Sequence, residues 1–102
     1  MIHPLIQKQI PEIKNVLLSH HVKSAYFFGS ACTDNFNDKS DVDILLDFEE
    51  HLSPLEKGDN WWEIYYSLKK LLKREVDLVT SGNLVNPYFI AELNNSKQII
   101  YG

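Results

Sequence analysis

A strand-like segment that begins with two closely spaced carboxylates constrains the fold of this chain more than any other feature. It reads Asp-Val-Asp-Ile-Leu-Leu-Asp-Phe from Asp41 to Phe48, and the apolar residues Ile44-Leu45-Leu46 predict a buried, central strand. Side chains alternate across a strand, so Asp41 and Asp43 point to the same face, roughly 6–7 Å apart along the chain. Burial of carboxylates without compensating partners costs free energy, so this pair indicates a function in which a bound group neutralises the charge.

The sequence on either side of this strand predicts alternating helices and strands. An amphipathic pattern predicts a helix that begins near Gln9 or Ile10 and ends between Ser19 and His21. The clearest helix covers residues 61–74, with an apolar stripe at spacings of three and four: Trp61, Tyr65, Leu68 and Leu72. Further strands are predicted over residues 22–28, 76–79 and 98–101, and a last helix over 86–94. Residues 31–40 are polar and rich in turn formers, which predicts either a loop or a short helix followed by a loop, and residues 49–60 are predicted to be an acidic connection.

This order of elements predicts an α/β (α+β) fold, with a small β-sheet of mixed direction and flanking helices. The 102 residues are 44% apolar and 24% charged, which fits one globular domain over residues 1–102. A domain of this size has a thin margin of stability, so a partner subunit that covers apolar surface would help it. A homo-oligomer is one form that such a partner could take.

Charge and composition exclude several classes of protein. The net charge of −4 argues against a protein whose main task is to grip free nucleic acid, because such binding depends on lysine and arginine contacts to phosphate. The single cysteine, Cys32, permits no disulfide within the chain, and we expect it to be a small packed side chain. No signal-peptide pattern and no apolar run of membrane-spanning length is present, so we expect a cytoplasmic protein that does not enter a membrane.

A third carboxylate, Asp77, also lies on a predicted strand between apolar neighbours. If that strand pairs with the one that carries Asp41 and Asp43, three carboxylates converge. Such a cluster is unfavourable alone, because like charges raise each other's pKa values. Oxygen ligands of this kind select Mg²⁺ or Mn²⁺, and two such ions can support an in-line phosphoryl displacement. We therefore predict a magnesium site at Asp41, Asp43 and Asp77.

A glycine and a serine follow the first predicted strand directly. Gly29 permits a tight turn and a close approach of the backbone to a phosphate, and the Ser30 hydroxyl adds a donor. Lys39 and Ser40, which precede the aspartate pair, are the other candidate nucleotide-binding residues. Taken alone, a Gly-Ser pair after a strand is usually only a turn, and an Asp-x-Asp pair is usually only solvated.

The combination of these segments resembles the polymerase-beta-like nucleotidyltransferases. Gly29-Ser30, ten residues and then Asp41-Val42-Asp43 match the Gly-Ser-x10-Asp-x-Asp pattern of that family, and Val76-Asp77-Leu78-Val79 matches its third-carboxylate strand. The length and order of the elements are most similar to its minimal nucleotidyltransferases, the MNT group. The resemblance runs over essentially the whole chain.

The resemblance implies a fold, a chemistry and a partner. The fold would be the nucleotidyltransferase core, with Asp41 and Asp43 binding two Mg²⁺ ions and Asp77 completing one ion's shell and helping to activate the acceptor hydroxyl. Gly29 and Ser30 would contact the triphosphate. Members of the group that this chain resembles are commonly paired with a helical HEPN-domain protein, often as the antitoxin to that toxin. Some of them transfer AMP from ATP to a tyrosine of the partner. We therefore expect a nucleoside triphosphate, ATP first, as the donor.

One departure from the family keeps a second hypothesis open. The family often reads Gly-Ser-Arg-Ala-Arg-Gly after its first strand, whereas this chain has Ala31 and Thr33 at the arginine positions and Asp34 at the second glycine. Lys39 either replaces part of the lost positive charge or faces solvent. The alternative function is therefore a binding antitoxin that neutralises its partner without transferring a nucleotide.

Two other groups of residues have simple structural interpretations. His20 and His21 lie at a helix end, where a cation suits the helix dipole, and no second ligand pair at zinc-site spacing accompanies them, so no metal role is assigned. Trp62 and Tyr66 lie one step round the helix from its apolar stripe. Large aromatic side chains at a surface favour protein interfaces, so Trp62 and Tyr66 either form part of such an interface or are partly buried in the monomer.

Overall fold

A four-stranded sheet organises the protein. The computed structural model describes residues 2–33 and 36–102. The strands β1 (Val22–Phe28), β2 (Val42–Phe48), β3 (Val76–Thr80) and β4 (Gln98–Tyr101) lie in the order β3-β2-β1-β4. β1 runs antiparallel to both β2 and β4, whereas β2 and β3 are parallel. The predicted mixed sheet is confirmed, and β2 is one of its two central strands.

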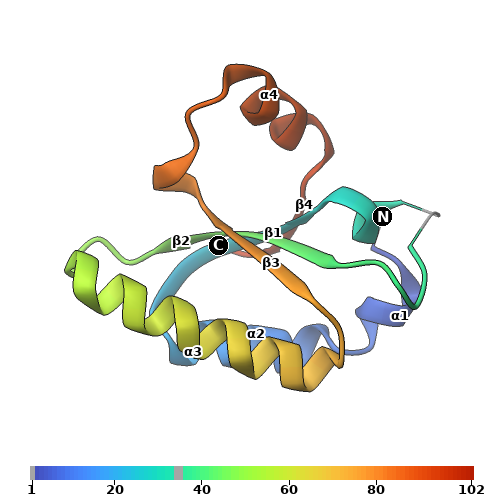
Figure 1. Ribbon diagram of the computed structural model, residues 1–102, viewed down its shortest axis with the longest axis horizontal. Helices are drawn as coiled ribbons and strands as arrows, with labels where there is room; N and C mark the ends of the chain where they lie inside the picture. Colours follow the sequence, from blue (N-terminus) through green and yellow to red (C-terminus); the bar gives the residue numbers. More distant parts are fainter. Residues whose placement is uncertain (1, 34–35) are drawn as a thin grey trace.

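The helices cover both faces of this sheet. Figure 1 shows α2 (Ile10–Ser19) and α3 (Pro54–Leu72) together on one side and α4 (Pro87–Ser96) on the other, with the short helix α1 (Pro4–Gln7) near the rim. The main core lies under α2 and α3, and its fully buried side chains include Leu17, Phe27, Ile44, Leu46, Ile64 and Leu68. A second, small core of Phe28, Leu45 and Leu93 lies under α4.

The alternation of side chains along β2 explains why its sequence is apolar on both faces. Val42, Ile44 and Leu46 face the main core, while Leu45 belongs to the small core under α4. Asp43 shares the face of Leu45, beyond the edge of that small core. The sequence prediction of a buried central strand is confirmed, and the strand carries its carboxylates on the less covered face.

The acidic connection predicted over residues 49–60 is wrong, because α3 begins at Pro54 rather than at Trp61. Ser53 caps the helix: its hydroxyl accepts from the Glu56 amide, and the Glu56 carboxylate accepts from the Ser53 amide. Pro54 at the first helical position has no amide hydrogen to leave unpaired. The first turns lie on the surface, so they show no apolar periodicity that would reveal a helix.

The other predicted helices and strands are confirmed within two residues. Of the segment predicted over residues 31–40, residues 34 and 35 lie outside the described residues. The α3 helix ends at Leu72, and Lys73 follows it in the left-handed conformation with φ of 55°. Two short 3₁₀ helices, η1 (Gly29–Cys32) and η2 (Ser81–Asn83), follow β1 and β3. None of the helices in the described part of the chain is long and apolar enough to cross a membrane.

The cap at Ser53 gives a test of where α3 begins. We expect Ser53→Ala to lower the free energy of unfolding by about 1 kcal/mol, because the Glu56 amide in the first turn loses the side-chain oxygen that accepts from it. Ser53→Asp keeps a side-chain acceptor and should stay close to wild type. Urea unfolding followed by far-UV circular dichroism measures both. Equal stability of Ser53→Ala and wild type would mean that the helix begins later, as its apolar stripe alone suggests.

Candidate active site

Two aspartates from neighbouring strands lie side by side. In the parallel pairing of β2 with β3, Asp43 is the direct partner of Asp77. Directly paired residues of neighbouring strands project from the same face of a sheet, so both carboxylates lie on the face that α4 partly covers. The conditional expectation from the sequence, that the third strand neighbours the second with Asp77 on the same face, is confirmed.

Burial and the charges of two other aspartates act on Asp43. Its pKa is raised from 3.8 to about 6, first because Asp43 is half-buried and then because the charges of Asp77 and Asp41 oppose its ionisation. Asp41 and Asp77 are exposed. The structure therefore gathers the three predicted carboxylates into one electrostatic unit in which Asp43 is the central and least solvated member.

The three carboxylates do not yet converge on one point. Within the described residues, their oxygen atoms are not all within 4.8 Å of one another. Asp41 and Asp77 are exposed, so rotation of their side chains is sterically open. The donor set consists of carboxylate oxygens, which fits the preference of Mg²⁺ for hard oxygen ligands and for water in the rest of its shell. These residues fit a divalent cation, and their role as its ligands remains a prediction.

The turn after β1 is built against Asp43. Gly29 has φ of 68°, a conformation that side chains other than glycine rarely adopt, and a Cβ atom on it would lie 2.2 Å from Asp43 Oδ2. Only glycine therefore permits this contact between backbone and carboxylate. The tight turn predicted at Gly29 is confirmed, and the group that its backbone approaches is Asp43. The approach of this backbone to a phosphate stays a prediction.

The loop before β2 positions the remaining candidates. Ser30 Oγ donates a long hydrogen bond of 3.4 Å to the Asp41 carbonyl, which joins the turn after β1 to the start of β2. Ser40 is used within its own loop: its hydroxyl accepts from the Asn37 amide at 3.0 Å. Lys39 is exposed. The structure therefore brings Ser30 to Asp41, while Lys39 and Ser40 lie on the loop that leads to it.

Arg74, the last residue of the helix predicted over residues 61–74, lies beyond the end of α3 and is a positioning residue. One of its guanidinium nitrogens, Nη1, donates to the carbonyls of Asn37 and Ser40, at 2.9 and 3.0 Å, and the group lies 4.6 Å from the centre of the buried Phe36 ring. It thereby fixes the loop that delivers Asp41. The available signal was compositional, since Arg74 is the only arginine in the chain.

A pocket opens beside the turn after β1. It has a volume of about 610 Å³ and lies between η1 and α4, with Phe28, Gly29, Thr33 and Phe89 among its lining residues. A larger pocket of about 740 Å³ lies between α3 and β3 and contains none of the predicted site residues. We associate the smaller pocket with the site, because Gly29 belongs to both.

The whole site lies within a region that matches a known family. The family model described as "Polymerase beta, Nucleotidyltransferase" matches residues 11–102. The chain belongs to this nucleotidyltransferase family. The residue pattern that led to the resemblance and the sheet that carries the aspartates therefore point to the same family of enzymes.

Individual members of the family are similar to the chain over most of its length. A Methanocaldococcus jannaschii protein named "putative protein adenylyltransferase" is 34% identical over 89 residues, which cover 79% of this chain and 87% of that protein. The crystal structure of a toxin–antitoxin with AMP-PNP has a TM-score of 0.72 at 21% identity, covering 91% of this chain and 73% of that one.

A second solved structure, of a tri-AMPylated Shewanella oneidensis HEPN toxin in complex with an MNT antitoxin, has a TM-score of 0.66 at 20% identity. The match covers 94% of this chain and 71% of that one. At these identities the two structures establish the fold alone, which is the nucleotidyltransferase core that the sequence predicted.

The family's usual arginines are replaced here by a buried alanine and an exposed threonine. Ala31 is fully buried, and its carbonyl accepts a hydrogen bond from the His3 amide at 3.0 Å. Thr33 donates its hydroxyl to the Ser30 carbonyl at 2.9 Å. Cys32 packs against the main core, and burial raises the pKa of its thiol. Asp34 lies outside the described residues.

Removal of the central carboxylate should stabilise the metal-free protein. A raised carboxyl pKa means that the folded state holds the proton more tightly, so the contribution of Asp43 is fully present below about pH 3.8 and is lost as the pH rises through 6. We expect Asp43→Asn to be more stable than wild type at pH 8, by on the order of 1 kcal/mol because solvent screens this half-exposed group. The difference should shrink between pH 7 and pH 4.

Urea unfolding in chelator across this pH range measures the effect, and Asp47→Asn on the same strand is the matched control. Added Mg²⁺ should stabilise wild type and Asp47→Asn but not Asp43→Asn. A difference between Asp43→Asn and wild type that did not change with pH would contradict the raised pKa.

The contact between Gly29 and Asp43 predicts a strong effect of one added methyl group. Gly29→Ala should lower the free energy of unfolding by about 1–3 kcal/mol, because its backbone conformation disfavours a side chain and its Cβ would collide with the carboxylate. It should also weaken Mg²⁺ binding, measured by calorimetry. The control is Gly58→Ala in α3, where a Cβ meets nothing within 4 Å and a gain of about 0.5–1 kcal/mol is expected. Equal behaviour of the two variants would argue against the turn geometry.

Proposed function

We propose that this chain transfers a nucleoside monophosphate, AMP from ATP, to a hydroxyl group of a partner protein. The partner we propose is a HEPN-domain toxin, with this chain as its antitoxin. The observation that carries the proposal is the pairing of Asp43 with Asp77, with the Gly29 turn packed against the Asp43 carboxylate. This arrangement supports the proposal, because it puts carboxylates that fit a divalent cation beside a glycine turn.

The roles of the residues follow from their places in the sheet. Asp41 and Asp43 would hold two Mg²⁺ ions, and Asp77 would complete the shell of one of them. Bound ions would supply the positive charge that a triphosphate and three carboxylates require. The backbone N–H groups at Gly29 and Ser30, with the Ser30 hydroxyl, would bind the phosphates, and Lys39 and Ser40 are further candidates from the loop before β2.

The transfer forms one bond and breaks one bond. The acceptor oxygen attacks the α-phosphorus of the nucleotide, and the bond from that phosphorus to the β-phosphate bridging oxygen breaks, so pyrophosphate leaves. The hydroxyl proton has an acceptor in Asp77, which is exposed and lies beside Asp43. Chemistry of this kind depends on positioning and on compensation of charge rather than on a covalent intermediate.

The pocket beside η1 supports a nucleotide at this turn. Its volume of about 610 Å³ lies within the range of small-ligand sites, and it borders Gly29 directly. Phe28 and Phe89 lie edge to face, 6.1 Å apart, and Phe89 keeps part of its ring exposed. We propose that the base lies against Phe89 while the phosphates point towards Asp43.

The donor and the acceptor are proposed from the family members. The Methanocaldococcus jannaschii relative is named as a protein adenylyltransferase. The Shewanella oneidensis complex contains a tri-AMPylated HEPN toxin. AMP-PNP, in the other complex, is an analogue of ATP. The exposed rings of Trp62 and Tyr66 on α3 offer an apolar surface for such a partner.

A second function, binding without transfer, is favoured by one observation. Ala31 is buried in the core and Thr33 bonds within its own turn, so neither position supplies positive charge to a triphosphate. In that case the chain would neutralise its partner by occupying it, and the three aspartates would serve no reaction.

Transfer of a labelled nucleotide separates these two functions. The chain is incubated with Mg²⁺, ATP labelled at the α-phosphate and a co-expressed HEPN-domain partner. We expect label on the partner with wild type and with Asp47→Asn, and its loss with Asp41→Asn/Asp43→Asn. ATP labelled at the γ-phosphate should leave no label, because the pyrophosphate departs.

Absence of label from all four nucleoside triphosphates would contradict the enzymatic proposal. If wild type and the double variant then inhibited the partner equally, the binding antitoxin would be the correct function. Label that persisted in the double variant would instead mean that Asp41 and Asp43 are not the metal ligands of the reaction.

A further inference from the structure

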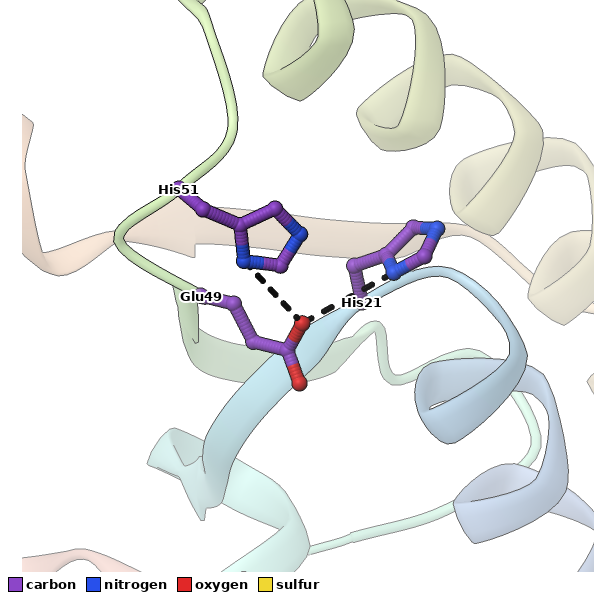
Figure 2. Close-up of side chains that lie close together, drawn as sticks. All are labelled: His21, Glu49 and His51. Carbon is purple, nitrogen blue, oxygen red and sulfur yellow. Dashed lines mark ion pairs between the residues drawn. The ribbon is translucent and has the colours of Figure 1, made fainter.

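We propose that His21, Glu49 and His51 form a zinc-binding site, separate from the aspartates. Within the described residues, these three are the group of potential metal ligands whose donor atoms all lie within 4.8 Å of one another. Figure 2 shows the two imidazole rings on either side of the Glu49 carboxylate, with one oxygen facing both rings. Two histidines and a glutamate are a ligand set that zinc commonly uses.

The distances between the donor atoms suit one small ion. Glu49 Oε2 lies 3.7 Å from His21 Nδ1 and 3.6 Å from His51 Nδ1. Two ligand atoms bound to a tetrahedral zinc ion at 2.0–2.1 Å are about 3.3–3.4 Å apart. Small rotations of three partly exposed side chains would therefore close the site, and their exposure leaves a fourth position to water.

The backbone around this cluster holds the ligands close without metal. The Glu49 amide donates to the His21 carbonyl at 3.0 Å, which extends the pairing of β1 with β2 by one more bond. His21 has φ of 64°, in the left-handed region, at the turn between α2 and β1. His51 precedes Ser53, the capped start of α3. Two ligands thus come from the same ladder and the third from a short connection that the α3 cap anchors.

The ligand chemistry separates this cluster from the aspartate site. Imidazole nitrogens suit zinc and related transition metals, whereas Mg²⁺ prefers the oxygen ligands of Asp41, Asp43 and Asp77. The two clusters lie at opposite ends of β1, roughly 20 Å apart at about 3.3 Å per residue. A bound zinc ion would join the α2–β1 turn to the β2–α3 connection and so stabilise the sheet end remote from the aspartates.

The test uses the tag-free full chain carrying Asp41→Asn/Asp43→Asn, so that the aspartate site does not take the added metal. Zn²⁺ binding is measured by equilibrium dialysis with metal analysis, and Co²⁺ serves as a spectroscopic probe of imidazole ligation. We expect one equivalent of metal per chain and a higher melting temperature with Zn²⁺. Bound Co²⁺ should show a visible absorption band typical of an ion with four or five ligands. His51→Gln should weaken binding by about tenfold or more, since it removes a direct ligand.

Two further variants keep the result interpretable. His21→Asn removes a ligand while retaining a residue that tolerates the left-handed backbone, and it should also lose the metal. His20→Asn is the matched control, because the two nitrogens of His20 face the Val16 carbonyl and Glu63 instead. It should bind metal as the parent does.

Equal binding by the parent, His21→Asn and His51→Gln would overturn the proposal, as would binding by none of them. In either case the cluster would be an ordinary set of histidine–carboxylate ion pairs at the surface.

Discussion

Parallel pairing of β2 with β3 brings the carboxylates of Asp43 and Asp77 to adjacent positions on one face of the sheet. Their mutual repulsion adds to the burial that raises the pKa of Asp43 to about 6. The sheet accepts this cost because the opposite face of β2 is buried against α2 and α3, so the apolar side chains of β2 fix its position. Packing on the opposite face of β2 therefore offsets the free-energy cost of the repulsion between Asp43 and Asp77.

The surroundings of Asp43 depend on that fixed position. The turn at Gly29 closes against the carboxylate and excludes any larger residue there. On the other side, Arg74 bonds to two carbonyls of the loop that delivers Asp41, and the Val42 amide donates to the Glu75 carbonyl. Arg74 and Glu75 thus hold the start of β2 through its backbone, whereas the Gly29 turn contacts the Asp43 carboxylate itself.

The two ends of the β1–β2 ladder carry different ligand chemistry. One end gathers aspartates, whose oxygens suit a hard divalent ion, and the other brings two imidazoles to a glutamate. The shared ladder explains how a chain of this size can hold both. The first cluster accords with the family to which the chain belongs, while the second arises from residues outside the family's motif.

The sequence by itself determined the strands and most helix bounds and singled out three aspartates as candidate ligands, because these predictions depend on local patterns of apolar and charged residues. The alternation in β2, the stripe of α3 and the spacing from Gly29-Ser30 to Asp41 were all visible without coordinates. The apolar pattern of the sequence did not predict the first turns of α3, because an exposed turn has no apolar periodicity. The capping box of Ser53 and Glu56 was the available signal.

Only the tertiary structure decided which distant residues meet. The register that pairs Asp43 with Asp77 is set by contacts across the sheet, and the contact of Gly29 with Asp43 requires two strands to be in place. Arg74 at the loop before β2, and His51 beside His21, are separated from their partners by about thirty residues or more, so no local spacing reveals them. Chain folding brings such groups together because burial of the core, rather than the groups themselves, fixes where each segment lies.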